Sequence, residues 1–319
     1  MATSDKQFDV VVIGDCNPDI ILRGPEVAPE FGQREKLVPD AVFVIGGSGS
    51  ITACACARVG LRTRFVGATG DDTFGRFMLD SLRTWDVDTA LCPVLHGSST
   101  GFSVILSRGE DRAILTHAGT IDSLELGSVP VEQLLEARHV HISSYFLQPR
   151  LASQLPSLVG LLRAQGVTVS VDPNWDPTGT WDGGLRSLLS QINIFLPNAA
   201  EARAMSGAHD TKGAASQLCR EVPLVVVKDG DKGGIAAEGA VPPTFFSHPA
   251  FPVQCADTTG AGDAFNAGFL RAWLDGLAVG DCLAYACATG ALSTRAIGAT
   301  GALPTLPEVR AMIHGPRDA

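Results

Sequence analysis

Four short runs of apolar, mostly β-branched residues recur along the chain, at 10–13, 167–171, 192–196 and 224–227. Runs that are apolar on both faces are typical of strands in a parallel sheet that helices cover on each side. Segments with a helical pattern lie between them, at 151–165, 199–205 and 212–220. This alternation predicts an α/β fold with three layers, in which a mostly parallel central sheet lies between two layers of helices.

Two stretches interrupt the alternation, because residues 16–45 and 93–118 are punctuated by Gly and Pro and read as extended chain. Within the second, Ser99–Thr116 is typical of a strand, a turn at 108–111 and a second strand. Both stretches are expected to form a small β appendage on the α/β core. The pattern leaves open an ordinary pair of surface hairpins and a lid over a site.

Composition narrows the class of protein. The chain has 319 residues, of which 45% are hydrophobic and only 18% are charged, which excludes a disordered or coiled-coil protein. No interdomain linker is evident, so we expect a single domain over 1–319. The net charge is −10, and nothing resembles the basic face that nucleic-acid binding requires.

The cysteine usage and the N-terminus predict the compartment. Eight cysteines are scattered without a C-x-x-C pair, as is typical of buried, reduced thiols in the cytoplasm. The first fifteen residues lack the pattern of a signal peptide, and no run of eighteen apolar residues would span a membrane. We therefore expect a cytoplasmic protein with neither a membrane nor a nucleic acid as partner.

The most informative segment is the string DTTGAGD at 257–263, which leads into a helical pattern. Gly260, Ala261 and Gly262 fall at a helix N-terminus, where free N–H groups and the helix dipole hold anions. Asp263 would repel a resting phosphate, but it suits a base that takes the proton of a hydroxyl attacking phosphorus. A tight turn in which Asp263 merely caps the helix is the alternative.

The complete string resembles the second signature of the PfkB-type carbohydrate kinases, the ribokinase-like family. Further segments resemble other motifs of that family in the expected order, at 14–19, 46–60, 66–75, 172–174, 197–201, 228–234 and 294–299. The resemblance thus covers nearly the whole chain. It implies a ribokinase-like fold with a lid formed by 16–45 and 93–118.

The resemblance also implies site residues and cofactors. Asp263 would be the catalytic base, and Gly260, Ala261 and Gly262 the anion hole. The acceptor would contact Asn17, Asp19, Gly46, Gly47, Ser48, Ile51, Ser144 and Asn174. ATP would contact Asn198, Glu201, Lys228, Gly230, Gly233 and Cys287. Glu201 would organise Mg²⁺ through water, and a monovalent cation such as K⁺ is a further candidate ligand near Asp257, Thr259 and Ser293.

Departures from the family pattern bear on the acceptor. Ile51 stands where many members have Asn, Ser48 where ribokinases favour Lys, and Asp176 where ketodeoxygluconate kinases have Arg. These changes, with no basic cluster near the candidate sugar residues, weigh against sugar acids and phosphorylated sugars. We therefore expect transfer of the ATP γ-phosphoryl to a primary hydroxyl of a small neutral sugar or polyol, such as ribose or fructose.

Three alternatives stay open at this stage. The first is a nucleoside kinase of the same family, which would need an apolar or aromatic slot for the base. The second is a regulator with the same fold that binds sugar or nucleotide without catalysis. The third concerns assembly, since exposed edges of the lid strands would allow two copies to associate as a homodimer.

Overall fold

The computed structural model describes residues 6–108, 111–239 and 241–315. Its central sheet is built from β1 (Phe8–Ile13), β4 (Thr63–Val66), β6 (Val87–Asp88), β10 (Ala137–Ile142), β11 (Thr168–Val171), β12 (Ile194–Phe195), β13 (Leu224–Lys228), β14 (Gly234–Glu238) and β15 (Thr244–His248). The strand order is β15-β14-β13-β12-β11-β10-β1-β4-β6. The pairs from β6 to β13 are parallel, and β14 and β15 add antiparallel pairs at one edge.

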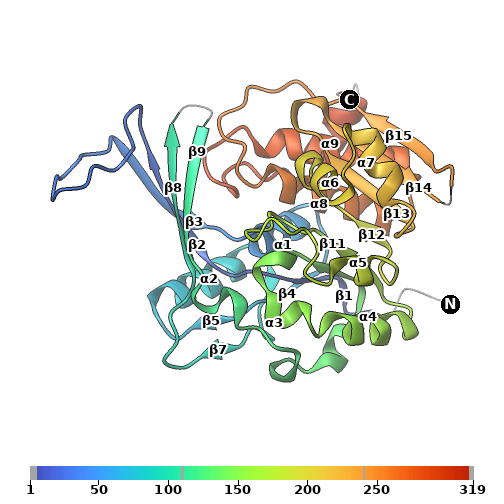
Figure 1. Ribbon diagram of the computed structural model, residues 1–319, viewed down its shortest axis with the longest axis horizontal. Coiled ribbons are helices and arrows are strands. Elements are labelled where there is room, and N and C mark those ends of the chain that lie inside the picture. The colour runs from blue at the N-terminus through green and yellow to red at the C-terminus, as the bar shows by residue number, and fades with distance from the viewer. Residues whose placement is uncertain (1–5, 109–110, 240, 316–319) are drawn as a thin grey trace.

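Ten α-helices are found in the described residues, and they cover both faces of this sheet (Figure 1). They are α1 (Ser48–Arg58), α2 (Thr73–Thr84), α3 (Pro149–Ala152), α4 (Leu155–Ala164), α5 (Leu185–Leu189), α6 (Ala199–Ser206), α7 (Thr211–Leu218), α8 (Ala261–Leu274), α9 (Val279–Ser293) and α10 (Leu306–His314). Val10 and Val12 of β1 belong to a core shared with α1, α2, α8, α9 and α10, whereas Val11 and Ile13 belong to the core under α3 to α7. Because alternate strand residues face opposite sides, the predicted three-layer fold is confirmed.

The single helix predicted at 151–165 is wrong. The structure has two helices there, α3 and α4, with a break at Ser153 and Gln154. Pro156 stands in the first turn of α4. A proline has no N–H for the helical bond to the residue four positions earlier, so it fits the start of a new helix better than the middle of a continuous one.

A second, four-stranded sheet projects from one side of the core (Figure 1). Its order is β3 (Asp40–Ile45), β2 (Pro18–Arg23), β8 (Phe102–Arg108) and β9 (Asp111–His117), and β2 pairs with β8 in parallel. The predicted hairpin is confirmed by the antiparallel pair β8–β9. Two residues of its predicted turn, Gly109 and Glu110, lie outside the described residues. We call these four strands the projecting sheet.

The projecting sheet begins later than the range 93–118 suggested. Val94–Leu95 forms β7, which pairs with β5 (Thr69–Gly70) in a separate two-stranded sheet. Gly70 allows this close approach, since a Cβ there would lie 2.1 Å from the Ser98 carbonyl oxygen. In the part of the chain that the structure describes, no helix is long and apolar enough to cross a bilayer.

Candidate active site

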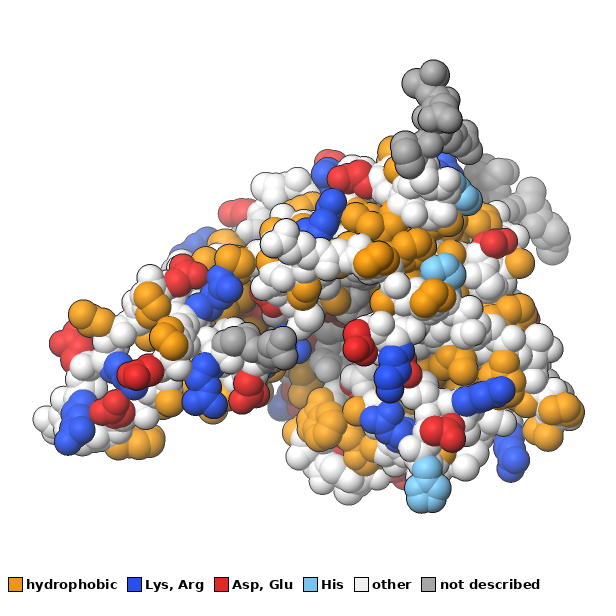
Figure 2. Space-filling model, turned by 90° about the horizontal axis from the view of Figure 1, so that it is seen from above, with side chains coloured by type: hydrophobic (Ala, Val, Ile, Leu, Met, Phe, Trp, Pro, Cys, Tyr) orange, Lys and Arg blue, Asp and Glu red, His pale blue; other side chains and the backbone are white. Residues whose placement is uncertain are grey.

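A cleft of about 1280 Å³ opens between the projecting sheet and the ends of the central strands. The molecular surface is hollowed between these two parts (Figure 2). The lining includes residues one to three positions after the ends of β1, β11, β12 and β13, as expected at the carboxyl ends of parallel strands. Seventeen predicted site residues line the cleft, namely Asn17, Asp19, Gly47, Ser48, Ile51, Asn174, Asn198, Glu201, Lys228, Gly230, Gly233, Thr259, Gly260, Ala261, Gly262, Asp263 and Cys287.

Four predicted residues are not part of the lining: Gly46, Ser144, Asp257 and Ser293. Gly46 lies behind Asp19, since a Cβ on it would come within 2.1 Å of the Asp19 carboxyl. Ser144 is buried and accepts a hydrogen bond from the side chain of Asn174 at 3.1 Å. Both residues therefore support a neighbour that does reach the cleft.

The predicted helix N-terminus is present at α8. Gly260 precedes the helix with φ of 74°, and a Cβ on it would lie 2.6 Å from the Cβ of Ala299. Both facts require glycine at this position. The Ala261 N–H donates to the Thr258 carbonyl at 3.2 Å. Among the described residues, no hydrogen bond is found for the N–H groups of Gly260 and Gly262, which are free to bind an anion.

Asp263 lies in the first turn of α8 with its carboxyl group in the cleft. Its Oδ1 accepts hydrogen bonds from the hydroxyls of Ser48 and, at 3.2 Å, Thr52. Burial, together with the negative charge of Asp172, raises the pKa of Asp263 to about 8. A carboxyl group with a pKa near physiological pH is suited to general-base catalysis.

Lys228 places its ammonium next to the start of α8. Its Nζ bonds to the Asp172 carboxylate at 2.5 Å, and the amide of Asn266 donates to the same oxygen at 2.6 Å. Burial alone would raise the pKa of Asp172, but the Lys228 ammonium and the Asn266 amide hold it below its ordinary value. A Cβ on Gly262 would lie 3.9 Å from Lys228 Nζ, so this cation flanks the anion-binding N–H groups.

Asn198 and Glu201 form a capping box at α6. The Asn198 side chain accepts the N–H of Glu201 at 2.9 Å, and Glu201 Oε2 accepts the N–H of Asn198 at 2.8 Å. Burial and the nearby Asp172 raise the pKa of Glu201 to about 7. In the described part of the chain no hydrogen bond to Oε1 is found, so this buried carboxylate has an oxygen left for a cation or its bound water.

The described residues contain no group of three or more His, Cys, Asp or Glu side chains arranged to hold a metal ion. A magnesium ion near Glu201 would therefore take most of its ligands from phosphate oxygens and water, as Mg²⁺ commonly does. Glu201 fits this arrangement, because a nearby cation relieves the unfavourable burial of its charge.

The part of the cleft lined by the predicted acceptor residues Asn17 and Asp19 is acidic. Asp19 is buried beside Asp15, and burial together with that second carboxylate raises the pKa of Asp19 to about 7. Asn17 contacts Asp19 at 3.5 Å. Asp15 itself accepts the backbone N–H groups of Ser48 and Gly49, at 3.1 and 2.8 Å, and so fixes the start of α1.

Asp257 and Thr259 are brought together, but Ser293 makes a separate contact. The Asp257 carboxylate accepts the Thr259 N–H and hydroxyl at 2.9 and 2.7 Å and the Gly298 N–H at 2.9 Å. The Ser293 hydroxyl donates to the Gly290 carbonyl of its own helix at 2.8 Å. Thr259 also receives a hydrogen bond of 3.1 Å from Arg112 of β9, which ties the projecting sheet to the loop before α8.

Another part of the cleft, with residues that the sequence predicts to bind nucleotide, is formed by the β13–β14 connection and the start of the loop before α8. Gly233 has φ of 93°, and a Cβ on it would meet the His248 carbonyl oxygen at 2.1 Å. The thiol of Cys287 is directed to the same carbonyl at 3.7 Å. Cys255 also lines the cleft and is the exposed member of the eight free cysteines.

Several residues in or beside the cleft are not among those that the sequence predicts for the site. Asp15 and Asp172 lie within the segments 14–19 and 172–174, which resemble family motifs, so the sequence contained a signal for both residues. Arg112 and Trp175 carried none, because only the packing of distant segments brings them to the cleft. Thr52 was missed because it looks like an ordinary helix residue until its contact with Asp263 is seen.

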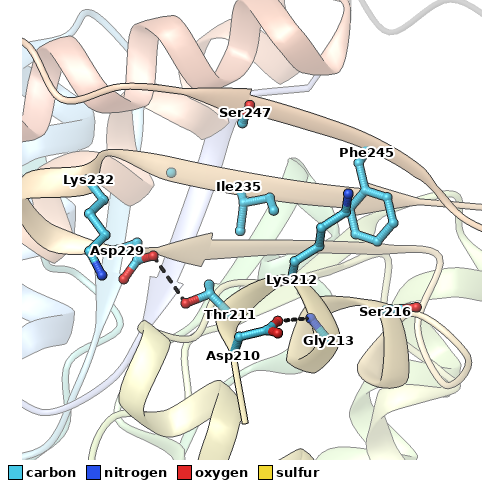
Figure 3. A pocket seen from close by; sticks show the side chains of 11 residues that line it. Asp210, Thr211, Lys212, Gly213, Ser216, Asp229, Lys232, Ile235, Phe245 and Ser247 are labelled. Atoms are coloured by element: carbon cyan, nitrogen blue, oxygen red, sulfur yellow. Dashed lines mark hydrogen bonds between the residues drawn. The ribbon is translucent and has the colours of Figure 1, made fainter. Parts of the chain in front are cut away.

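A second pocket of about 690 Å³ lies between α7 and the strands β14 and β15 (Figure 3). Asp210 caps α7 by accepting the Gly213 N–H at 2.7 Å, and Thr211 donates to Asp229 at 3.1 Å. Lys212 lies over the ring of Phe245 at 4.8 Å. These contacts join α7 to the edge of the sheet, and none of the predicted site residues lines this pocket.

A sequence model described as pfkB family carbohydrate kinase matches residues 7–306. This chain belongs to that family. It is 30% identical over 308 residues to a protein of Halopiger xanaduensis named ATP-dependent ribose-1-phosphate kinase, a match that covers 95% of this chain and 97% of the relative. It is also 30% identical over 311 residues to a fructokinase of Salmonella typhimurium, covering 92% of this chain and 96% of the relative.

The fold of this pfkB-family kinase is shared with solved structures. A ribokinase-like protein of E. coli, crystallised in complex with ATP and Mg²⁺, superposes with a TM-score of 0.83 at 23% identity over 96% of this chain and 98% of that one. The ribokinase-like fold expected from the motifs is therefore confirmed. As a member of a carbohydrate kinase family, the protein is a phosphotransferase with an alcohol group as acceptor.

Proposed function

We propose that this kinase transfers the γ-phosphoryl of ATP to a hydroxyl, in particular a primary one, of a small neutral sugar or polyol such as ribose or fructose. One observation carries this proposal. The Asp263 carboxyl lies at the N-terminus of α8, beside the free N–H groups of Gly260 and Gly262, between the acidic acceptor side of the cleft and its nucleotide side.

The reaction step follows from these positions. Asp263 accepts the proton of the acceptor hydroxyl as its oxygen forms a bond to the γ-phosphorus, and the bond from phosphorus to the bridging oxygen of ADP breaks. The N–H groups at the start of α8 and the Lys228 ammonium stabilise the negative charge on the transferring group. Positioning and electrostatics thus supply most of the acceleration.

Cofactor and cation sites extend the proposal. Magnesium, held by Glu201 through water, would neutralise charge on the β- and γ-phosphates; the E. coli structural relative contains ATP and Mg²⁺. The capping box gives Glu201 a fixed orientation for this role. A monovalent cation such as K⁺ beside Asp257, Thr259 and Ser293 is part of the proposal, and replacing K⁺ by a tetraalkylammonium ion in the assay tests it.

The projecting sheet is proposed as the lid of the cleft. Ser103, Ile105, Arg112, Ile114 and Thr116 from its strands line the cavity, so its inner face covers the acceptor side. Excluding water there would suppress hydrolysis of ATP. The strands β3 and β9 are the edges of the projecting sheet, and the homodimer proposed through them is testable by analytical ultracentrifugation. The eight free cysteines support a reducing compartment, the cytoplasm.

The charge of the cleft supports a neutral acceptor. Six carboxyl groups line it, those of Asp15, Asp19, Asp172, Glu201, Asp231 and Asp263, against the two cations Arg112 and Lys228. Lys228 is already paired with Asp172. A phosphorylated or acidic acceptor would add negative charge to this excess, at a cost in binding free energy.

A nucleoside is the second candidate acceptor, and a specific observation favours it. The aliphatic side chains Ile51, Ile105, Ile114, Ile121 and Leu147 line the cleft, as does the exposed ring of Trp175. An apolar wall of this extent exceeds what a free pentose needs, and it would fit the planar base of a nucleoside.

The deciding experiment measures ADP release from MgATP with ribose, fructose, polyols, ribose 1-phosphate, sugar acids, adenosine and cytidine, and repeats it with Asp263→Asn. We expect one neutral compound to stimulate turnover and the variant to lose at least about 100-fold. Full activity of Asp263→Asn would contradict the assignment of Asp263 as the base. ATP binding without turnover on any compound would favour the non-catalytic regulator.

A further inference from the structure

The proposed base has one carboxylate oxygen that is already fully engaged. Ser48 and Thr52 stand four residues apart on α1 and therefore face the same side of the helix. Both hydroxyls donate to Oδ1 of Asp263 across the contact between α1 and α8. In the described part of the chain, no hydrogen bond to Oδ2 is found.

Ser48 is itself held by a series of contacts. The buried hydroxyl of Ser143 donates to the Ser48 hydroxyl at 2.9 Å. The Ser48 backbone N–H donates to Asp15 at 3.1 Å. A hydroxyl has a single proton, and Ser48 commits that proton to Asp263 while accepting from Ser143. While Ser48 donates to Asp263, its hydroxyl has no proton left for the acceptor, with which the sequence predicts a contact.

Thr52 behaves differently from other buried hydroxyl residues of the helices. Ser50 and Thr289 donate to the carbonyl four residues earlier in their own chain, at 2.8 and 2.7 Å, onto Gly46 and Tyr285. Thr52 is fully buried and had the same option. It donates to Asp263 instead, so its hydroxyl bonds to the proposed base rather than to a carbonyl of its own helix.

We propose that Ser48 and Thr52 act as positioning residues that hold Oδ1 of Asp263 and leave Oδ2 to accept the proton of the acceptor hydroxyl. This inference rests on the proposed function of Asp263 as the base. Two donors on one oxygen fix the rotation of the carboxyl group, so Oδ2 keeps one direction toward the cleft. The same two bonds stabilise the ionised form, which is the form that a base requires.

The test compares matched variants of α1. Thr52→Val removes the hydroxyl and keeps the shape of the side chain, whereas Thr52→Ser keeps the hydroxyl. Ser48→Ala removes the other donor. Thr289→Val, in α9 and outside the cleft lining, is the control for losing a buried hydroxyl in the same region. The pH dependence of kcat/KM is measured with the best acceptor of the panel above.

We expect the acid limb of the profile to move upward by about one pH unit in Thr52→Val and Ser48→Ala, with kcat near pH 7 about tenfold lower and KM for MgATP unchanged. Thr52→Ser and Thr289→Val should keep the wild-type limb. A merely structural role of Thr52 would lower the amount of folded enzyme without moving the limb.

Two outcomes separate this inference from the proposed function. If Asp263→Asn keeps full activity, the base assignment is wrong and the inference is lost with it. If Asp263→Asn is inactive but Thr52→Val and Ser48→Ala keep the wild-type limb, only the inference is overturned. A ¹³C titration of the Asp263 carboxyl, assigned by its loss in Asp263→Asn, measures the same shift without any acceptor, and an unchanged titration in both variants also overturns it.

Discussion

Individual carboxyl groups in the cleft differ in protonation because their surroundings differ. Burial raises the pKa of Asp19 and Glu201 to about 7 and that of Asp263 to about 8. Asp172 keeps a low pKa because Lys228 and Asn266 bond to its carboxylate. The Lys228 ammonium thus keeps Asp172 ionised, and the negative charge of Asp172 then raises the pKa of Glu201 and of Asp263.

The first prediction at this scale concerns the rate. Because the proposed base must be ionised and its pKa lies at about 8, kcat/KM should rise with pH up to about 8 and level off above it. The measurement is the pH profile from 6 to 9.5 at saturating MgATP. A profile that is flat over this range would contradict the assignment of Asp263 as the base.

The second prediction concerns stability. The unfolded chain loses the Asp263 proton near pH 4, whereas the folded protein keeps it up to about 8. The contribution of this carboxyl to the free energy of unfolding of the wild type therefore falls as pH rises from 4 to 8. Asp263→Asn should melt higher than the wild type at pH 8, by at least about 2 °C, and the gain should shrink at pH 5. Calorimetry at both pH values measures this difference in melting temperature, and an equal gain at pH 5 and pH 8 would refute the prediction.

Of the helices whose N-termini reach the cleft, α1 and α8 each follow a glycine with positive φ. Gly47 precedes α1 with φ of 74°, and Gly260 precedes α8 with the same value. The helix starts carry the groups that the proposed chemistry uses, Ser48 on α1 and Asp263 on α8. Their mutual placement depends on packing along the two helices rather than on any single motif.

Gly260→Ala should therefore abolish activity. The new Cβ would be 2.6 Å from the Ala299 Cβ, so the start of α8 must shift and its N–H groups with it; we expect at least about a 100-fold loss of kcat. Gly276→Ala is the matched control, because Gly276 also has positive φ, of 81°, but a Cβ there meets nothing within 4 Å. It should cost about 1 kcal/mol of stability and leave kcat unchanged. Similar kinetics of the two variants would contradict the prediction.

At the scale of the whole molecule, residues of both the projecting sheet and the core line the cleft. Arg112 joins the two by its hydrogen bond to Thr259. Thr259 lies in the loop that leads into α8, so this contact reaches the chain directly before the helix start. This hydrogen bond thus joins the proposed lid to the loop before the proposed anion site.

Arg112→Ala should loosen this arrangement. We expect KM for the acceptor to rise about tenfold and the ratio of ATP hydrolysis to transfer to increase, because water enters the cleft. Arg34→Ala is the control, since Arg34 is an exposed arginine in the β2–β3 connection that contacts Glu30 rather than the core. Phosphate and phosphorylated product are quantified in parallel. An unchanged ratio in Arg112→Ala would count against the lid.

The sequence predicted the three-layer fold, the β8–β9 hairpin and the start of α8, because each rests on local periodicity or on a glycine-rich motif. It did not predict the break between α3 and α4, where a proline overrides the apolar pattern. Nor did it give the contact of Thr52 with Asp263 or the approach of Arg112, which join residues 211 and 147 positions apart. Such pairs depend on how layers pack, and no local pattern encodes them.

We expect Cys255 to report nucleotide occupancy of the cleft. It is exposed in the cleft, whereas burial raises the pKa of the Cys92 and Cys287 thiols to about 12 and suppresses their reactivity. A thiol reagent should therefore modify one site per chain rapidly. ATP at ten times its Kd should slow that modification about tenfold, as followed by intact-mass spectrometry. Footprinting at a single native thiol would thus measure nucleotide affinity before any acceptor is known.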